Sequence, residues 1–167
     1  MNPSPSSHRF SPERALELGR QTLSIEAAAV DALKDRINGD FAAAIELILN
    51  CHGRLIVSGM GKSGHIARKI AATMASTGTP AYFVHPAEAS HGDLGMIARD
   101  DVFLALSNSG ESDELVRILP LLRRQGAKLV AMTGNAQSSL AREADLHLDA
   151  GVAQEACPHN LAPTAST

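Results

Sequence analysis

The chain begins with two stretches in which apolar residues recur at helical spacing. In residues 12–37 the apolar positions fall roughly on one side of a helix, and Ser11-Pro12-Glu13 is a plausible helix start. A shorter pattern predicts a second helix over residues 41–50. The apolar positions of the first helix are Leu16, Leu18, Leu23, Ile25, Val30, Leu33 and Ile37.

From residue 54 onward, short apolar runs alternate with helical patterns. The runs predict strands and the patterns between them predict helices, while residues 86–98 are expected to form a loop with a helical turn. Such alternation predicts an α/β fold, a five-stranded parallel sheet flanked by helices in three layers, with the two N-terminal helices preceding it. The predicted strands are 54–58, 80–85, 102–106, 128–133 and 146–148, and the helices are 63–76, 111–125 and 138–143.

Composition narrows the classes of protein to consider. With 167 residues, 44% of them apolar, the chain can form one domain with a full core. A net charge of −3 and 3% aromatic residues argue against nucleic-acid partners, and no apolar stretch approaches the ~20 residues of a membrane span. Two cysteines without a CxxC motif indicate a reducing cytoplasm. Residues 1–11 are expected to be a disordered leader rather than a signal peptide, and residues 12–167 the domain.

Parallel sheets bind ligands at the carboxyl ends of their strands, so the segments after each strand are the candidate sites. Ser107-Asn108-Ser109-Gly110-Glu111-Ser112 follows the strand over residues 102–106 and leads into a helix. Backbone N–H groups, hydroxyls and a helix N-terminus together favour an anion. We therefore expect Ser107, Ser109 and Ser112 to bind a phosphate group.

A second candidate turn, Gly59-Met60-Gly61-Lys62-Ser63-Gly64, follows the first strand. It matches the GxGxxG dinucleotide pattern and contains a Gly-Lys-Ser, but the surrounding residues fit neither motif. A P-loop needs a glycine where Ile56 stands, and the second strand ends in His85-Pro86 instead of an acidic residue. The alternatives are a ligand-binding turn with Lys62 as its cation, or a surface lysine in a connection.

Two histidines and carboxylates occur together in the next strand-end loop. His85, Glu88, His91 and Asp93 could bind a metal ion, or could form hydrogen bonds with sugar hydroxyls. After the last strand, Glu155 lies between small and apolar residues. Desolvation there would raise the pKa of its carboxyl, and a raised pKa suits a general base. The alternative is that Glu155 is an exposed acidic residue in a loop.

These segments together resemble the sugar isomerase (SIS) domain, and within it the arabinose 5-phosphate isomerases. The resemblance rests on Gly-Met-Gly-Lys-Ser-Gly-His, on the serine turn, and on the runs that begin at Ala75, His91 and Glu155. It implies reversible isomerisation of D-ribulose 5-phosphate to D-arabinose 5-phosphate through a cis-enediol, feeding Kdo and lipopolysaccharide synthesis. No cofactor is implied, because the carbonyl of the substrate acidifies the neighbouring C–H group.

The resemblance also implies roles for individual residues. Lys62, Glu114 and Glu155 are expected to be catalytic, and His85 could bind an inhibitory zinc ion. A further family histidine and a pair of CBS domains have no counterpart in this chain, so the domain is expected to be incomplete at its C-terminal side. The residues expected to line the sugar site are Gly78, Thr79, His85, His91, Gly151, Val152 and Ala153.

The partners implied are a sugar phosphate and other copies of the chain in a homotetramer, with neither nucleic acid nor membrane. Two alternatives to a working enzyme stay open. SIS domains also sense sugar phosphates without catalysis, so the chain could be a binding module. It could also be a folded but inactive part of an enzyme.

Overall fold

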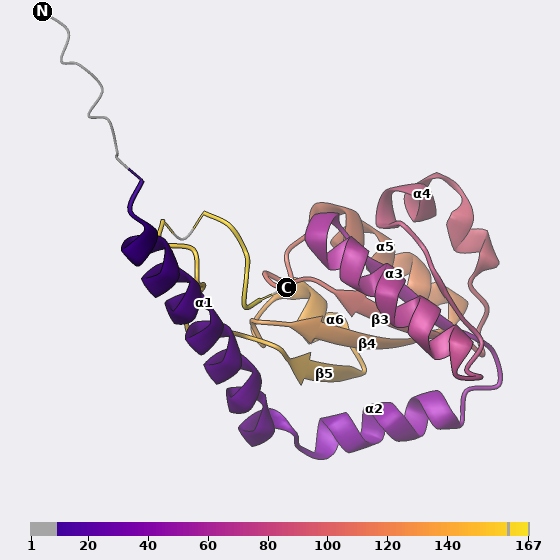
Figure 1. Ribbon diagram of the computed structural model, residues 1–167. Coiled ribbons are helices and arrows are strands. Elements are labelled where there is room, and N and C mark those ends of the chain that lie inside the picture. Colours follow the sequence, from indigo (N-terminus) through magenta and orange to yellow (C-terminus); the bar gives the residue numbers. More distant parts are fainter. Residues whose placement is uncertain (1–9, 160, 167) are drawn as a thin grey trace, which may run out of the picture.

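A parallel five-stranded sheet organises the chain (Figure 1). The computed structural model describes residues 10–159 and 161–166. Within them the strands pair in the order β2-β1-β3-β4-β5, and every pairing is parallel, which confirms the predicted fold class. The strands are β1 (Leu55–Gly59), β2 (Ala81–Phe83), β3 (Val102–Leu106), β4 (Lys128–Thr133) and β5 (Leu146–Asp149).

The helices also follow the predicted order, with differences at their ends. The first predicted helix is divided, because the chain tightens into a 3₁₀ turn before residue 37. The predicted loop over residues 86–98 contains a short helix and a 3₁₀ turn, more helix than the single turn expected. The helical elements are α1 (Pro12–Ala32), η1 (Leu33–Arg36), α2 (Gly39–Leu49), α3 (Gly61–Ser76), α4 (Pro86–His91), η2 (Asp93–Met96), α5 (Asp113–Gln125) and α6 (Ser139–Glu143).

The second strand is shorter than its apolar run, and the reason lies at its carboxyl end. The ring Nδ1 of His85 accepts the N–H of Ala87 at 3.3 Å, so His85 is the N-cap of α4. Pro86 then occupies the first helical position, where its missing N–H costs nothing. The predicted strand over residues 80–85 is therefore too long at its carboxyl end, because His85 caps the helix that follows.

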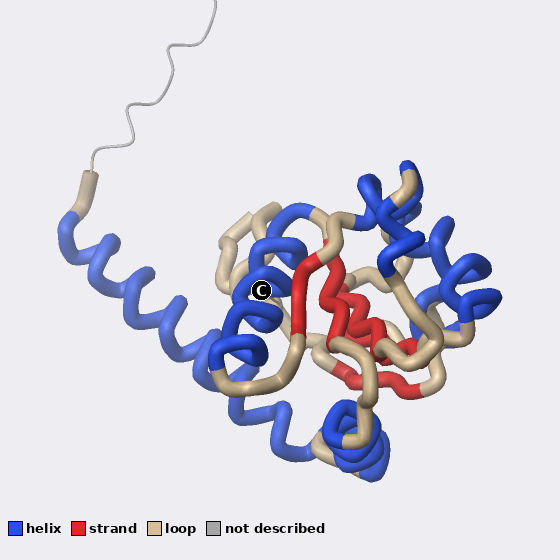
Figure 2. Tube along the Cα trace, turned by 90° about the vertical axis from the view of Figure 1, so that its right-hand side faces the viewer, coloured by secondary structure: helices blue, strands red, loops and turns tan. Residues whose placement is uncertain are grey.

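Each face of the sheet is covered by its own helices, as Figure 2 shows with helices on both sides of the strands. Alternate strand residues point to opposite faces. On one face, Ile56, Phe103 and Ala105 pack with α4, α5 and α6. On the other, Val57, Leu104 and neighbouring residues pack with α2 and α3. This double coverage explains why the central strands β1 and β3 are apolar and buried throughout.

The strand order fixes where a ligand can bind. After β1 the chain adds β2 on one side, and then returns to add β3 on the other side of β1. Because the connecting helices lie on opposite faces at this switch point, a crevice opens between the carboxyl ends of β1 and β3. Gly59 pairs with Leu106 in this register, so the glycine turn and the serine turn leave the sheet side by side.

Helix α1 stands apart from the sheet (Figure 1). The Ser11 hydroxyl accepts the N–H of Arg14 and caps its start, as the sequence predicted. None of its residues is buried, and the predicted apolar side is mainly exposed at Leu16, Leu23 and Val30. Among the described residues, no helix is both long and apolar enough to cross a membrane.

Candidate active site

The serine turn folds back on its own backbone at the end of β3. Ser107 is buried, and its hydroxyl and carbonyl oxygens both accept the N–H of Gly110 at 3.1 Å. The Ser109 hydroxyl accepts the N–H of Glu111 at 3.2 Å. Gly110 has a φ of 68°, and a Cβ there would lie 2.0 Å from the Ser138 hydroxyl oxygen. The tight turn therefore requires glycine at this position.

The N-terminus of α5 follows this turn and has no side-chain cap. Ser112 is the N-cap residue, but its hydroxyl donates to the Glu114 carboxylate at 3.3 Å instead of accepting a first-turn N–H. The first-turn N–H groups of this 13-residue helix thus have no acceptor from the cap residue, which suits an anion. Ser112 and Glu114 thus contact each other directly at the start of α5.

Glu111, within the serine turn, has a structural role. Its carboxylate accepts the N–H of Ser139 at 2.7 Å and so caps the start of α6. This backbone hydrogen bond, with a further one from the Ser139 side chain, lowers the pKa of Glu111. Glu111 therefore ties the serine turn to the helix beside it.

The glycines of the turn after β1 serve close packing between strand and helix. A Cβ on Gly64 would lie 2.6 Å from the carbonyl oxygen of Gly59, and a Cβ on Gly59 would lie 2.9 Å from Ser63. Gly61 has a φ of 54°. The GxGxxG spacing is thus explained by steric needs of the turn, without a dinucleotide.

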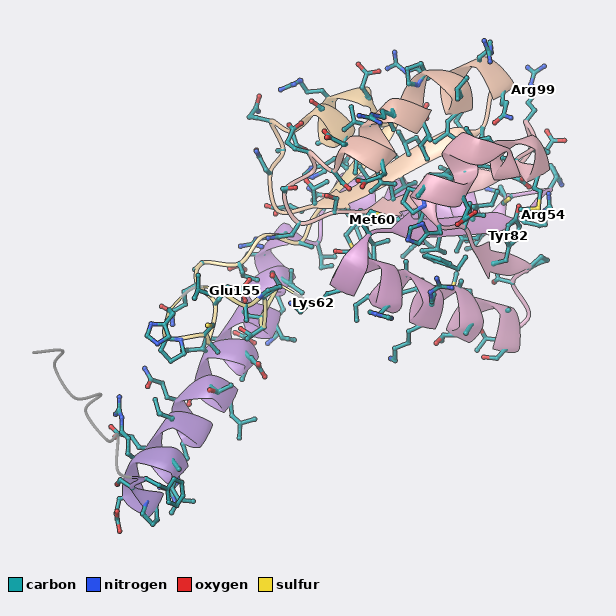
Figure 3. All side chains as sticks on the ribbon, turned by 90° about the horizontal axis from the view of Figure 1, so that it is seen from above. Arg54, Met60, Lys62, Tyr82, Arg99 and Glu155 are labelled. Atoms are coloured by element: carbon teal, nitrogen blue, oxygen red, sulfur yellow. The ribbon has the colours of Figure 1, made fainter. Side chains whose placement is uncertain are left out.

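Lys62 is the cation of this turn. It is exposed, in the first turn of α3, and no other described residue forms a hydrogen bond or ion pair with its side chain. Figure 3 shows Lys62 and Glu155 at the same end of the molecule, while Arg54, Tyr82 and Arg99 lie at the other. Lys62 is therefore available to a ligand at the carboxyl end of the sheet.

A pocket of about 270 Å³ opens at this end. Its walls come from the ends of β3 and β4, from α3, from α1 with η1, and from the C-terminal segment. Of the predicted site residues, Ser107 and Val152 line it. The other lining residues were not predicted one by one, although Asn108, Thr133 and Gly134 belong to the segments at the carboxyl ends of β3 and β4. The remaining lining residues include Ser63, Asn108, Thr133, Gly134, Leu33 and Ser166.

Glu155 is held by the segment that follows it. Its Oε2 accepts the N–H of Thr164 at 2.7 Å, the Thr164 hydroxyl at 2.9 Å and the N–H of Ser166 at 3.3 Å. Burial alone would raise the pKa of this carboxyl, but the hydrogen bonds from Ser166 and Thr164 outweigh it and lower the pKa from 4.5 to about 2. The expectation of a raised pKa is therefore wrong, because the neighbouring donors dominate over desolvation.

Residues 151–153 follow β5 and lie against α1 and η1. The N–H of Gly151 donates to Asp149 at 2.8 Å, and the Arg36 guanidinium donates to the Gly151 carbonyl and lies 3.7 Å from the Asp149 carboxylate. Gly151, Val152 and Ala153 line a second, more apolar pocket of about 320 Å³ shared with α1. Only Val152 of the three also reaches the pocket at the ends of β3 and β4.

Two predicted residues lie far from this end within one chain. Gly78 and Thr79 follow α3 and precede β2, so they lie at the amino end of the sheet. His85 lies at the carboxyl end of β2 and is half-buried. The side chain of His91 is outside what the structure describes, and the described residues contain no cluster of metal-ligating groups that would hold an ion. Of the predicted residues, the structure thus brings Ser107 and Val152 into one pocket and places Gly78 and Thr79 at the opposite end of the sheet.

With this geometry established, comparison with known proteins identifies the class. The model of the SIS domain family matches residues 48–167, and the chain belongs to this family. It is 62% identical over 148 residues to "Arabinose 5-phosphate isomerase KdsD" of Pseudomonas aeruginosa, covering 89% of this chain and 45% of that protein. The KdsD protein of Escherichia coli K12 is 53% identical over 151 residues, covering 90% and 46%. The chain therefore spans a little under half the length of these relatives.

A solved structure agrees with this relationship. The structure described as E. coli CFT073 c3406 in complex with A5P superposes with a TM-score of 0.89 at 43% identity. The match covers 94% of this chain and 84% of that one. Both the fold and the family are thus shown, and the sequence-based resemblance is confirmed.

Proposed function

We propose that this chain forms the catalytic domain of an isomerase that interconverts D-ribulose 5-phosphate and D-arabinose 5-phosphate. The observation that carries the proposal is the 62% identity to a KdsD protein over 89% of the chain. The uncapped helix after the serine turn and the free lysine of the glycine turn support it, because they suit a phosphorylated ligand at the β1–β3 switch point. The product would feed Kdo and lipopolysaccharide synthesis in the cytoplasm.

The proposed reaction moves one proton between C1 and C2 of the sugar and another between their oxygens, through a cis-enediol. It needs a carboxylate base, a proton donor to the oxygens and a cation near the enediolate. In our proposal Glu155 is the base, Glu114 moves protons or orients Lys62, and Lys62 stabilises phosphate or enediolate charge. Glu155 is ionised near neutral pH and so able to accept a proton, while the hydrogen bonds that lower its pKa to about 2 also weaken it as a base.

Phosphate binding is assigned to Ser107, Ser109 and Ser112 with the N-terminus of α5. The Ser107 and Ser109 hydroxyl oxygens accept backbone N–H groups, so their O–H groups can donate to phosphate beside the helix N–H groups. The Ser112 hydroxyl donates to Glu114 and would have to turn away from it to bind phosphate. His85, His91 and residues 151–153 would line the site of the sugar. Gly78 and Thr79 lie at the other end of the sheet, so a role for them requires the site of a neighbouring subunit.

We also propose that the chain assembles as a homotetramer. The support is the row of exposed apolar side chains on α1 at seven-residue spacing, Leu16, Leu23 and Val30, continued by Ile37. Further exposed apolar residues follow on α2 at four-residue spacing. Exposed apolar residues that recur along one helix without buried residues are typical of an interface between subunits. The α2 residues are Phe41, Ile45 and Leu49.

One pair of measurements tests the proposed activity. Arabinose 5-phosphate binding is measured by calorimetry, and ribulose 5-phosphate formation is followed in the same preparation. Binding with turnover supports the isomerase. Binding without turnover identifies a sugar-phosphate-binding module or an inactive part of an enzyme, and absence of both contradicts the assignment.

A further inference from the structure

The hydrogen bonds around Glu155 close a loop of the chain onto itself. Thr164 donates twice to Oε2 of Glu155, through its backbone N–H and through its hydroxyl. The same hydroxyl oxygen accepts the N–H of Ala156 at 2.7 Å, so Thr164 bonds to two successive residues. The segment between Glu155 and Thr164 is therefore fastened at its base by one side chain from each end.

This fastening determines what faces the pocket. Directly after Thr164, Ala165 and Ser166 form one wall of the 270 Å³ pocket at the ends of β3 and β4. Ala29 and Val30 of α1 also line this pocket. The hydrogen bonds to Glu155 thus fix both a carboxylate near the strand ends and the segment that lines the pocket.

The groups that act on Glu155 are neutral. Burial raises the pKa of Glu155, and the hydrogen bonds from Ser166 and Thr164 lower it by more. No charged side chain contributes to the shift. On the α1 side, Arg36 is paired with Asp149 and the Gly151 carbonyl. Lys62, from α3, makes no ion pair with Glu155 in the described part of the chain. The state of the carboxylate therefore depends on these donors rather than on an ion pair.

We propose that Thr164 is a positioning residue for Glu155 and fixes the orientation of its carboxylate. All three of the observed hydrogen bonds end on Oε2, so Oε1 takes no part in this network. Donors that bond only to the anion favour it over the protonated acid. Loss of the Thr164 hydroxyl should leave the fold in place and make Glu155 easier to protonate and less well oriented.

The test compares Thr164→Val, which keeps the shape and the backbone N–H, with Thr164→Ser, which keeps the hydroxyl. The pKa of the Glu155 carboxyl is measured by ¹³C NMR on the whole chain with labelled glutamate. We expect the wild type and Thr164→Ser to titrate near 2. Thr164→Val should shift only part of the way toward the ordinary 4.5, because the donors of Ser166 and the backbone N–H of Thr164 remain. Thr77→Val is the matched control, because its hydroxyl bonds only to carbonyls of its own helix.

The kinetic half of the test rests on the proposed isomerase activity. In this assay, the poorer orientation of Glu155 in Thr164→Val should lower kcat about tenfold with a smaller change in KM. The acidic limb of the pH profile of kcat should move to higher pH. The serine variant should restore both. An unchanged titration of Glu155 in Thr164→Val would overturn the proposal. A wild-type protein without turnover would overturn the proposed function instead, and would leave the NMR result to decide the role of Thr164.

Discussion

Gly59 and Gly64 approach so closely that a Cβ on Gly64 would lie 2.6 Å from the carbonyl oxygen of Gly59. The contact joins the last residue of β1 to the first turn of α3, and it holds the glycine turn against the strand. Since backbone atoms form both sides of the contact, neither a rotamer change nor a flexible side chain can relieve a clash there.

We therefore expect Gly64→Ala to destabilise the chain by on the order of 1–3 kcal/mol, the usual cost of overpacking. Urea unfolding measures it. The control is Gly19→Ala, because Gly19 lies within α1 with nothing near its Cβ position. That change should leave stability equal or raise it by about 0.5–1 kcal/mol, as expected for glycine to alanine in a helix. Equal effects of the two substitutions would show that the close contact is not required.

Asp101 fastens the amino end of the sheet. Its buried carboxylate accepts the N–H groups of Arg54 and Ala98, each at 2.8 Å. Asp101→Ala would leave these donors unpaired and should cost about 2–4 kcal/mol in the free energy of unfolding. The neighbouring Asp100 has an exposed side chain, so Asp100→Ala should change stability little. Thermal and urea unfolding of both variants check the difference.

Lys62 should matter for ligand binding but not for folding. Lys62→Met removes the cation of the glycine turn, so it should weaken arabinose 5-phosphate binding by about tenfold or more while the unfolding midpoint stays unchanged. Lys69→Met is the control, since Lys69 is exposed on the same helix farther from the strand end. Calorimetric titration compares the two. Equal affinities in the two variants would remove Lys62 from the site.

Acid should release the segment fastened by Glu155. Because the folded-state pKa is lowered from 4.5 to about 2, the contribution of Glu155 to stability is present above pH 4.5 and is lost as the pH falls toward 2. Glu155→Gln should therefore lower stability at pH 7, and the difference from wild type should shrink below pH 4.5. Glu46→Gln, on the exposed side of α2, is the control and should show no such pH-dependent difference. A constant difference between pH 7 and pH 3 would contradict the assigned pKa.

The exposed apolar row on α1 gives the prediction for assembly. Leu23→Glu should shift the protein to a smaller oligomer in sedimentation velocity, because it places a charge in the centre of the proposed interface. Met96→Glu also adds a charge at an exposed apolar residue, but on η2 rather than on α1. It should leave the oligomer unchanged. A wild type that sediments as a monomer would contradict the tetramer.

Much of this fold follows from local patterns. The strands β3 and β4 coincide with their predicted ranges, because each is a short apolar run with clear turn residues at its ends. The division of the first helix and the helical content of residues 86–98 could not be read from apolar spacing alone. In both places the backbone depends on caps and tight turns that span only a few residues.

The site was predictable in part. The strand-end rule gives the serine turn and the glycine turn, and the parallel order brings them together at the switch point. The pKa of Glu155 was predicted in the wrong direction, because the donors come from Thr164 and Ser166, whose approach depends on the path of the intervening loop. The α1 residues that line the pocket carry no sequence signal for that role.

The central claim is that this domain moves a proton on a sugar phosphate through an enediol. The most direct measurement is NMR of arabinose 5-phosphate incubated with the protein in D₂O. The proton that the base takes from C2 can exchange with solvent while the enediol exists, so deuterium should appear at C1 of the ribulose 5-phosphate that forms, and at C2 of any arabinose 5-phosphate re-formed from it. Glu155→Gln should abolish the incorporation. Isomerisation without deuterium, or binding of the sugar phosphate with neither exchange nor product, would contradict the account.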